Sequence, residues 1–352
     1  LVRPCPVSAR AVDCLIEPQP KVASMGGCAE CEMSYLGQMT LRLAAGAMRL
    51  PETLRCRHVE FLAAAQNADG GFSGREGPSD LYYTGFALRG LALLGGLSQA
   101  AASRAAGFLR DRVGEGVPMV DYLSLVFSAV LLDLAAGIDV FGQAGRDRGR
   151  DLQAATARFR RLDGGFAKTE RSGSSSIYHT FLVAACLELA GVPLAEPERM
   201  IAMVRSRQRP DGGFVELAGL QYSGTNPTAA AIGLLRLGDA LDDDARLRSI
   251  AFLAGMQNAE GGLRAHARIP MADLLSTFAG LTALVDLTGL GAVDRGAVGR
   301  YVRALEAPEG GFRGGICDDC RDVEYTFYGL GALALLAASG DGWDAHESTD
   351  RG

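Results

Sequence analysis

The sequence lacks the features that mark membrane proteins, nucleic-acid-binding proteins and secreted proteins. No continuous apolar run in its 352 residues approaches the roughly 20 that a membrane-spanning helix needs, so we expect no transmembrane segment. No basic stripe accompanies the net charge of −6, which argues against nucleic acid as a partner. The first two dozen residues contain no apolar core of a secretory signal. Together these absences predict a cytoplasmic protein.

The sequence also lacks a linker that would divide it into domains. No Ser/Pro-rich stretch interrupts the chain, although the chain is long for one ordinary domain. Four prolines near the start predict a loose, poorly ordered N-terminal arm over residues 1–24. We expect a single domain over residues 25–340 and a C-terminal tail over 341–352. Hydrophobic residues make up 48% of the sequence, which is enough for one large core.

The most informative pattern is an internal repeat. A motif of an acidic residue, two glycines and Phe or Leu occurs five times. The first glycines of the five copies are Gly70, Gly164, Gly212, Gly261 and Gly310. The steps between them are 94, 48, 49 and 49 residues, so the first step is two ordinary ones. The degenerate stretch Gly114–Val117 falls where the missing copy should be. Counting it, the sequence contains six repeat units.

Each unit contains the same pair of segments. An amphipathic segment such as His58–Gln66 precedes the glycine turn, and a more uniformly apolar segment follows a polar loop. The apolar segments are rich in Ala, Leu and Gly and lack β-branched alternation, which predicts helices. They are Tyr83–Leu94, Tyr122–Leu134, His179–Leu189, Thr228–Leu237, Leu274–Leu287 and Tyr325–Leu335. Because an all-apolar helix must be buried on every side, we predict an all-α fold, an (α/α)6 toroid with an inner and an outer ring.

The repeat resembles that of prenyltransferase β subunits and of squalene and other terpene cyclases. The best copies of its turn are Gln66–Phe72, Gln208–Phe214 and Gln257–Leu263, and the resemblance covers about residues 35–337. It implies an isoprenoid-handling enzyme that binds the prenyl chain of an isoprenoid or isoprenoid diphosphate in a central apolar cavity, with the polar head at the rim of the inner helices. It also implies a possible helical α subunit as partner. An acid-initiated terpene cyclase and a non-catalytic toroid that binds a lipid or a partner are the alternatives.

Polar side chains gather where the loops lead into the inner helices, so we expect the site at that rim. The catalytic candidates are Asp273, Asp322, Glu324 and His179. The substrate-binding candidates are Arg264, Arg268, Asp121, Tyr83, Tyr178, Tyr325 and Tyr328. An acid whose pKa is raised by an apolar cavity, such as Asp322 or Glu324, could protonate an alkene or act as a general base. The aspartates could equally be helix N-caps.

The resemblance does not extend to the zinc site of protein prenyltransferases. That family holds zinc with an Asp-x-Cys pair before one inner helix and a His before the next. Asp273 is present here, but Leu275 stands in the place of the cysteine and Tyr325 in the place of the histidine. Leucine cannot bind zinc, so we expect neither this zinc ion nor ordinary prenylation of protein cysteines. The Asp-x-Asp-Asp acid of protonation-type cyclases is also absent.

Two other patterns leave Zn²⁺ or Mg²⁺ open as a cofactor. Asp318, Asp319 and Asp322 spell D-D-x-x-D, and hard carboxylates suit Mg²⁺. Two C-x-x-C pairs would meet around one Zn²⁺ if the first and last units of a closed ring are neighbours. Their residues are Cys28, Cys31, Cys317 and Cys320. Redox pairs, disulfides and unconnected loop cysteines are the alternatives to such a zinc clamp.

Overall fold

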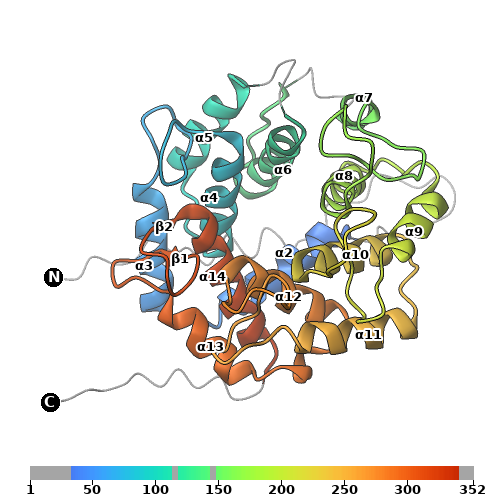
Figure 1. Ribbon diagram of the computed structural model, residues 1–352. Helices are drawn as coiled ribbons and strands as arrows, with labels where there is room; N and C mark the ends of the chain where they lie inside the picture. The colour runs from blue at the N-terminus through green and yellow to red at the C-terminus, as the bar shows by residue number, and fades with distance from the viewer. Residues whose placement is uncertain (1–32, 113–117, 143–147, 341–352) are drawn as a thin grey trace, which may run out of the picture.

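The computed structural model describes residues 33–112, 118–142 and 148–340, whose helices form two concentric rings (Figure 1). The inner ring consists of α4 (Leu81–Leu93), α6 (Met119–Ala136), α8 (Ile177–Leu189), α10 (Thr225–Leu237), α12 (Leu274–Asp286) and α14 (Val323–Ala338). The outer ring consists of α3 (Glu52–Ala64), α5 (Gln99–Arg110), α7 (Arg148–Ala157), α9 (Pro197–Ser206), α11 (Asp243–Ala254) and α13 (Arg295–Ala304). The predicted (α/α)6 toroid is therefore confirmed, and each inner helix begins within three residues of its predicted start.

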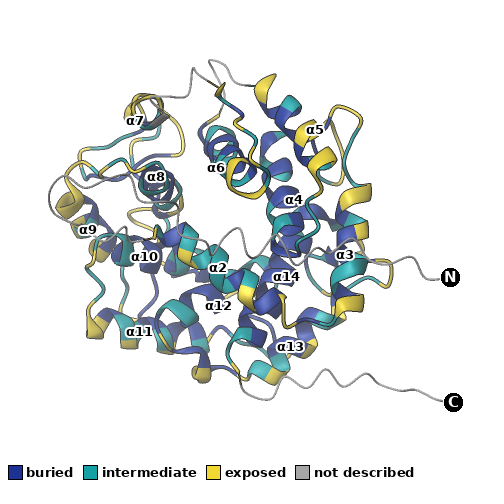
Figure 2. Ribbon diagram, turned by 180° about the vertical axis from the view of Figure 1, so that it is seen from behind, coloured by how far each residue is buried: buried dark blue, intermediate teal, exposed yellow. Residues whose placement is uncertain are grey.

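Composition decides which helix of each pair lies inside. Inner helices such as α12 and α14 consist of Leu, Ala and Gly with few charges, and most of their residues are buried. The exposed residues concentrate on the outer helices and on the loops (Figure 2). An amphipathic outer helix buries one stripe against the inner ring, while an inner helix has neighbours on nearly every side.

The glycine turns are structural, as the sequence predicted. In the fourth repeat the backbone of Gly212 has φ of +89°, which is the left-handed region that favours glycine. The following Phe214 is fully buried, and its backbone N–H donates to Thr228 Oγ1 on α10 at 2.9 Å. The same bond joins Phe72 to Thr84 and Phe166 to Thr180 at 2.9 Å. Each turn thus fastens its loop to the next inner helix.

Two alanine substitutions separate the two physical reasons for glycine, which are a positive φ and the close approach of neighbouring atoms. A Cβ on Gly212 would lie 2.3 Å from the carbonyl oxygen of Arg248, whereas Gly219, with φ of +82°, has nothing within 4 Å. We expect Gly219→Ala to lower the free energy of unfolding by about 1 kcal/mol through backbone strain alone. Gly212→Ala should lower it by about 3 kcal/mol because overpacking adds to that strain. Urea denaturation measures both, and equal losses would contradict the role of the close approach.

The ring closes between its last loop and its first outer helix. His58 on α3 is fully buried and stacks on Phe312, with the ring centres 4.8 Å apart. Its Nδ1 accepts the backbone N–H of Gly311 at 3.0 Å, and its Nε2 lies 3.1 Å from Glu306. In the same loop β1 (Phe312–Arg313) pairs antiparallel with β2 (Arg321–Asp322). First and last units are therefore neighbours, as a closed ring requires.

One helix outside the repeats, α2 (Tyr35–Ala47), was not predicted and closes one end of the ring. It packs against α14, α8 and α4 and lies across the inner ring in Figure 2. The backbone N–H of Tyr35 donates to Glu188 at 2.8 Å, and its hydroxyl donates to Asp286 at 2.7 Å. Glu188 and Asp286 stand at the C-terminal ends of α8 and α12. The opposite end, where the inner helices begin, is the predicted rim.

The expectation of no transmembrane segment needs one qualification. Within the described ranges, α6 alone is long and apolar enough to cross a membrane by length and composition. It packs against α4, α5 and α8. An inner-ring helix that is apolar on nearly every side meets the same criteria, so its place in the ring accounts for its composition.

Candidate active site in the central cavity

The inner ring encloses a cavity of about 600 Å³, a size typical of small-molecule sites. All six inner helices and α2 contribute to its wall. The aromatic lining residues are Tyr35, Tyr82, Phe86, Phe127, Tyr178, Phe181, Phe278, Phe327 and Tyr328. Aromatic faces pack against apolar chains and attract cations, so this wall suits a hydrocarbon ligand and its charged intermediates.

A positive charge lies within this aromatic wall. Arg89 on α4 lines the cavity, and its guanidinium carbon is 4.1 Å from the ring centre of Phe86, 4.8 Å from Phe327 and 5.3 Å from Phe127. Its Nε donates to the carbonyl oxygen of Gly85, one turn earlier, at 3.0 Å. Burial lowers the pKa of Arg89, and neighbouring tyrosines and Glu324 partly offset that effect.

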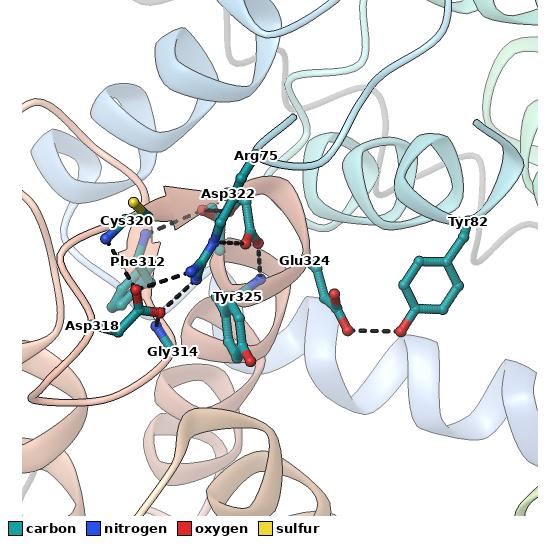
Figure 3. Close-up of polar contacts among 10 residues, drawn as sticks. Arg75, Tyr82, Phe312, Gly314, Asp318, Cys320, Asp322, Glu324 and Tyr325 are labelled. Carbon is teal, nitrogen blue, oxygen red and sulfur yellow. Dashed lines mark hydrogen bonds and ion pairs between the residues drawn. The ribbon is translucent and has the colours of Figure 1, made fainter. Parts of the chain in front are cut away.

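A carboxyl group with two tyrosine partners lies beside the cavity. Glu324 Oε1 accepts from the Tyr82 hydroxyl at 2.7 Å and from the Tyr328 hydroxyl at 3.0 Å, and both tyrosines line the wall. Figure 3 shows the bond from Tyr82 on α4 to Glu324 on α14. Burial raises the pKa of Glu324, while the two hydroxyl donors and Arg89 lower it by less. A carboxyl group with a raised pKa keeps its proton to higher pH, as a general acid requires.

The predicted catalytic aspartates are helix N-caps at the rim. Asp322 accepts the backbone N–H of Tyr325 at 2.8 Å, and Asp273 accepts that of Ser276 at 2.7 Å. Burial raises the pKa of Asp273, and its bonds from Ser276 lower it by less. Neither aspartate is among the residues that line the cavity. The structure thus gives both acids a capping role and leaves their catalytic role a prediction.

The magnesium site predicted from D-D-x-x-D is not assembled. Arg75 donates from Nε to Asp322 at 2.9 Å and from Nη1 to Asp318 at 2.9 Å, as Figure 3 shows. Burial would raise the pKa of Asp318, but hydrogen bonds, first that from Arg75, hold it below its usual range. Asp319 is exposed. A permanent guanidinium charge therefore pairs with two of the three carboxylates that the sequence assigned to Mg²⁺, and the magnesium site stays a prediction.

The zinc clamp cannot be placed as a whole, because Cys28 and Cys31 lie outside the described residues. Cys317 and Cys320 are exposed free thiols. In the part of the chain that the structure describes, no three His, Cys, Asp or Glu side chains come together to hold a metal ion. The clamp stays a prediction. The N-terminal arm, the C-terminal tail and the degenerate turn at 114–117 also lie outside the described residues.

His179 is held at the start of α8, away from the cavity wall. It is 8% exposed, and its Nδ1 lies 2.8 Å from the hydroxyl of Ser176, which also bonds Glu216. Burial, and then the charge of Lys168, lowers the pKa of His179 to about 4, so the ring is neutral near pH 7. Ser176 caps α8 through the backbone N–H of His179 at 3.1 Å.

The predicted cations do not reach the cavity. Arg264 donates to the carbonyl oxygen of Gly255 at 2.9 Å, at the C-terminal end of the outer helix α11. Arg268 donates to the hydroxyl of Tyr222, an exposed loop residue, at 2.7 Å. Arg264 therefore binds the end of an outer helix and Arg268 binds a loop residue, whereas Arg89 is the cation among the residues that line the cavity.

The remaining predicted residues divide between wall and rim. Tyr178 and Tyr328 line the cavity. Asp121, Tyr83 and Tyr325 stand in the first turns of inner helices without reaching it. Burial raises the pKa of each of these three side chains. The substrate-binding role of these residues at the rim stays a prediction.

Sequence reasoning missed Arg89, although the sequence carries a signal for it. Arg89 is the only charged residue of α4 and stands well inside the helix, not at an end. A charge in the middle of an otherwise apolar buried helix needs a partner or a function. Tyr82 lies on the same face, about one helical turn before Phe86 and two before Arg89. It was not singled out because tyrosine at a helix start is unremarkable.

Fold and cavity define a helical toroid with an aromatic ligand chamber, and known proteins share this architecture. The family model described as the prenyltransferase alpha-alpha toroid domain matches residues 25–115 and 152–196. No curated protein matches the sequence. The predicted resemblance to the prenyltransferase and terpene-cyclase toroids is confirmed by this match and by solved structures.

Three solved structures illustrate the range of the fold. Candida albicans protein geranylgeranyltransferase-I complexed with GGPP is 13% identical with a TM-score of 0.64, over 80% of this chain and 91% of that one. Type II terpene cyclase MstE from Scytonema, with its substrate geranylgeranyl dihydroxybenzoate, is 15% identical with a TM-score of 0.55, over 86% and 98%. A glycosidase in complex with glucose is 14% identical with a TM-score of 0.53, over 85% and 97%. At these identities the likeness establishes the fold, and function must be argued from the site.

Proposed function

We propose that this protein is an isoprenoid-handling enzyme that binds a prenyl chain in the central cavity. The observation that carries the proposal is the lining itself, in which nine aromatic side chains surround about 600 Å³ and α2 contributes to the wall. A glucose-like ligand would need many polar partners, and this wall offers few. The prenyl chain of the ligand lies among the aromatic rings, and its polar head points toward the N-terminal ends of the inner helices. Two structural neighbours carry geranylgeranyl groups, which supports the same class of ligand.

A second candidate, acid-initiated cyclisation, is favoured by Glu324. Its carboxyl group has a raised pKa and bonds two tyrosines of the wall. In this reaction the carboxylic acid gives its proton to a carbon–carbon double bond, whose π electrons form the new C–H bond and leave a carbocation. Further double bonds attack the cation to close rings, and a proton lost at the end makes the sequence a net isomerisation. Aromatic faces such as Phe278 and Phe327 stabilise the intermediate cation.

Filling the cavity tests the proposed ligand class. Ala279 lines the wall on α12, so Ala279→Trp places a large ring in the space of the prenyl chain. We expect the affinity for geranylgeraniol, measured by calorimetry in mild detergent, to fall at least ~10-fold. Leu247→Trp is the control, because Leu247 lies on the outer helix α11 and is 58% exposed. A wild-type protein that binds no isoprenoid, or equal losses in both variants, would contradict the proposal.

Three further points stay predictions. The first is a helical α subunit as partner, which would need an apolar docking surface on the outer helices. Of the large hydrophobic residues exposed within the described ranges, only Leu247 lies on an outer helix. The cytoplasmic location rests on the sequence alone. A non-catalytic, lipid-binding role is distinguished by Glu324, since simple carriage of a lipid requires no acid beside the chamber.

A further inference from the structure

We propose that Arg89 binds the head group of the ligand just beneath the rim, and that this head group is a carboxylate. The ligand is then a prenylated carboxylic acid. This inference rests on the proposed function and names its substrate class. It also assigns anion binding to an arginine inside the ring. The sequence had assigned that role to Arg264 and Arg268, which bond groups outside the cavity.

The first support is that Arg89 forms no direct ion pair, although Glu324 is near enough to influence its charge. Among the described residues, no carboxylate forms an ion pair with it, and its one hydrogen bond runs from Nε to the carbonyl oxygen of Gly85 on its own helix. The terminal guanidinium nitrogens therefore remain available in a wall that is otherwise mostly apolar. A desolvated cation is costly unless it is paired, and stacking on Phe86 and Phe327 replaces only part of its hydration. A bound anion would supply the charge partner and the hydrogen-bond acceptors that the buried guanidinium lacks.

The second support is the position of the guanidinium within the cavity. Helical side chains lean toward the N-terminus of their helix, so Arg89 reaches back over Gly85 toward the rim. Tyr328, Tyr178 and Tyr82 are near enough to influence its charge equilibrium. All three tyrosines line the cavity together with Arg89. The apolar remainder of the cavity then extends toward α2, which fits a ligand with one polar end.

The third support concerns how much charge the site can neutralise. Arg89 is the only Lys or Arg among the lining residues, the one carboxylate among them, Glu216, is bonded to Ser176, and no three potential metal ligands meet in the described ranges. A diphosphate would carry at least two negative charges into this chamber and leave one unpaired. A carboxylate carries one charge and matches the planar fork of a guanidinium with two parallel hydrogen bonds. The single cation therefore favours a carboxylate over a diphosphate.

The same pairing makes acid chemistry possible in the chamber. An unpaired Arg89 would repel a carbocation held against Phe86, Phe327 or Phe127. Once a ligand carboxylate neutralises the guanidinium, that repulsion is removed and the aromatic faces can stabilise the cation. Arg89 then selects the substrate, and Glu324 remains free to deliver a proton.

Three probes that share one geranylgeranyl chain and differ in the head group test the inference, and their binding to the full-length protein is measured. They are geranylgeranoic acid, geranylgeraniol and geranylgeranyl diphosphate. We expect wild-type protein to bind the acid at least ~10-fold more tightly than the alcohol, and more tightly than the diphosphate. Arg89→Gln should remove the preference for the acid and leave the affinity for the alcohol within about twofold. Arg89→Lys keeps the charge without the fork and should keep a reduced preference for the acid.

The control is Arg112→Gln, since Arg112 also stacks on a phenylalanine, Phe108 at 3.5 Å, but is not among the cavity-lining residues. It should change none of the three affinities. Equal binding of acid and alcohol by wild type would overturn the inference, as would tighter binding of the diphosphate or an Arg89→Lys variant without preference. Binding of the alcohol alone keeps the proposed function and removes this inference. Failure to bind any probe overturns both.

Discussion

Replacing Glu324 with glutamine is expected to abolish acid-initiated turnover while the fold remains intact. Glutamine keeps the size of the side chain and can still accept from Tyr82 and Tyr328, but it cannot release a proton. General acid catalysis contributes typically about 10²–10⁴-fold, so kcat should fall by that factor or more while the affinity for the substrate changes little. Product analysis with a prenylated acid as substrate measures the loss, and the urea midpoint checks the fold.

The pH dependence of wild-type turnover provides an independent check on Glu324. Burial raises its folded pKa above the ordinary glutamate value, so the protonated form persists to higher pH than for an exposed glutamate. Activity should be constant at low pH and fall as pH rises through that raised pKa. The native state also binds this proton more tightly than the unfolded chain, so stability decreases across the same pH window as pH rises.

Deuterium labelling separates cyclisation from prenyl transfer. In D₂O, a proton delivered from Glu324 becomes a deuteron, and each cyclised product should carry one at the carbon that was protonated. Glu324→Asp shortens the side chain but keeps the acid, and should retain part of the activity that glutamine loses. A Glu324→Gln variant with wild-type turnover, or unlabelled products from wild type, would exclude Glu324 as the initiating acid.

Replacing Asp286 with alanine is expected to have the largest effect on stability, because it opens the closed end of the ring. The side chain of Asp286 is 4% exposed and accepts from Tyr35 Oη at 2.7 Å, Arg42 Nη1 at 2.9 Å and Arg236 Nη1 at 3.0 Å. Alanine leaves three donors without their acceptor. Since both arginines are partly exposed and can turn to water, we expect a loss of about 2–3 kcal/mol in the free energy of unfolding.

The matched control is Asp244→Ala, which removes an exposed carboxylate paired with Arg248 at 3.2 Å. Its effect should stay within about 0.5–1 kcal/mol, because exposed ion pairs contribute little. Asp286→Ala should also weaken the binding of the alcohol and the acid alike, since the loss of contacts from α2 affects the chamber and not the head group. Equal destabilisation by the two substitutions would show that the contacts of Asp286 do not hold α2 against the ring.

Several residues of the candidate site could be predicted from the sequence, but the role of each acid could not, for a physical reason. Glu324 could be singled out because it opens an apolar helix, and Tyr178 and Tyr328 because they stand near the start of one. Asp273 and Asp322 stood out by the same criterion, yet they turn to their own backbone, because a short side chain at an N-cap reaches the free N–H groups first. Sequence spacing alone cannot tell an acid that caps a helix from one that bonds the side chains of a cavity wall.

The number of repeats, the inner and outer place of each helix and the structural role of the glycine turns could all be predicted from the sequence. These features follow from local rules, since a left-handed turn needs glycine and an all-apolar helix needs burial on every side. The tertiary structure was needed to find that Arg75 neutralises Asp318 and Asp322, that α2 packs against the inner ring, and that Arg89 stacks on Phe127 and Phe327. Each of these contacts joins residues of different helices or loops, and only the packing of the rings brings them together.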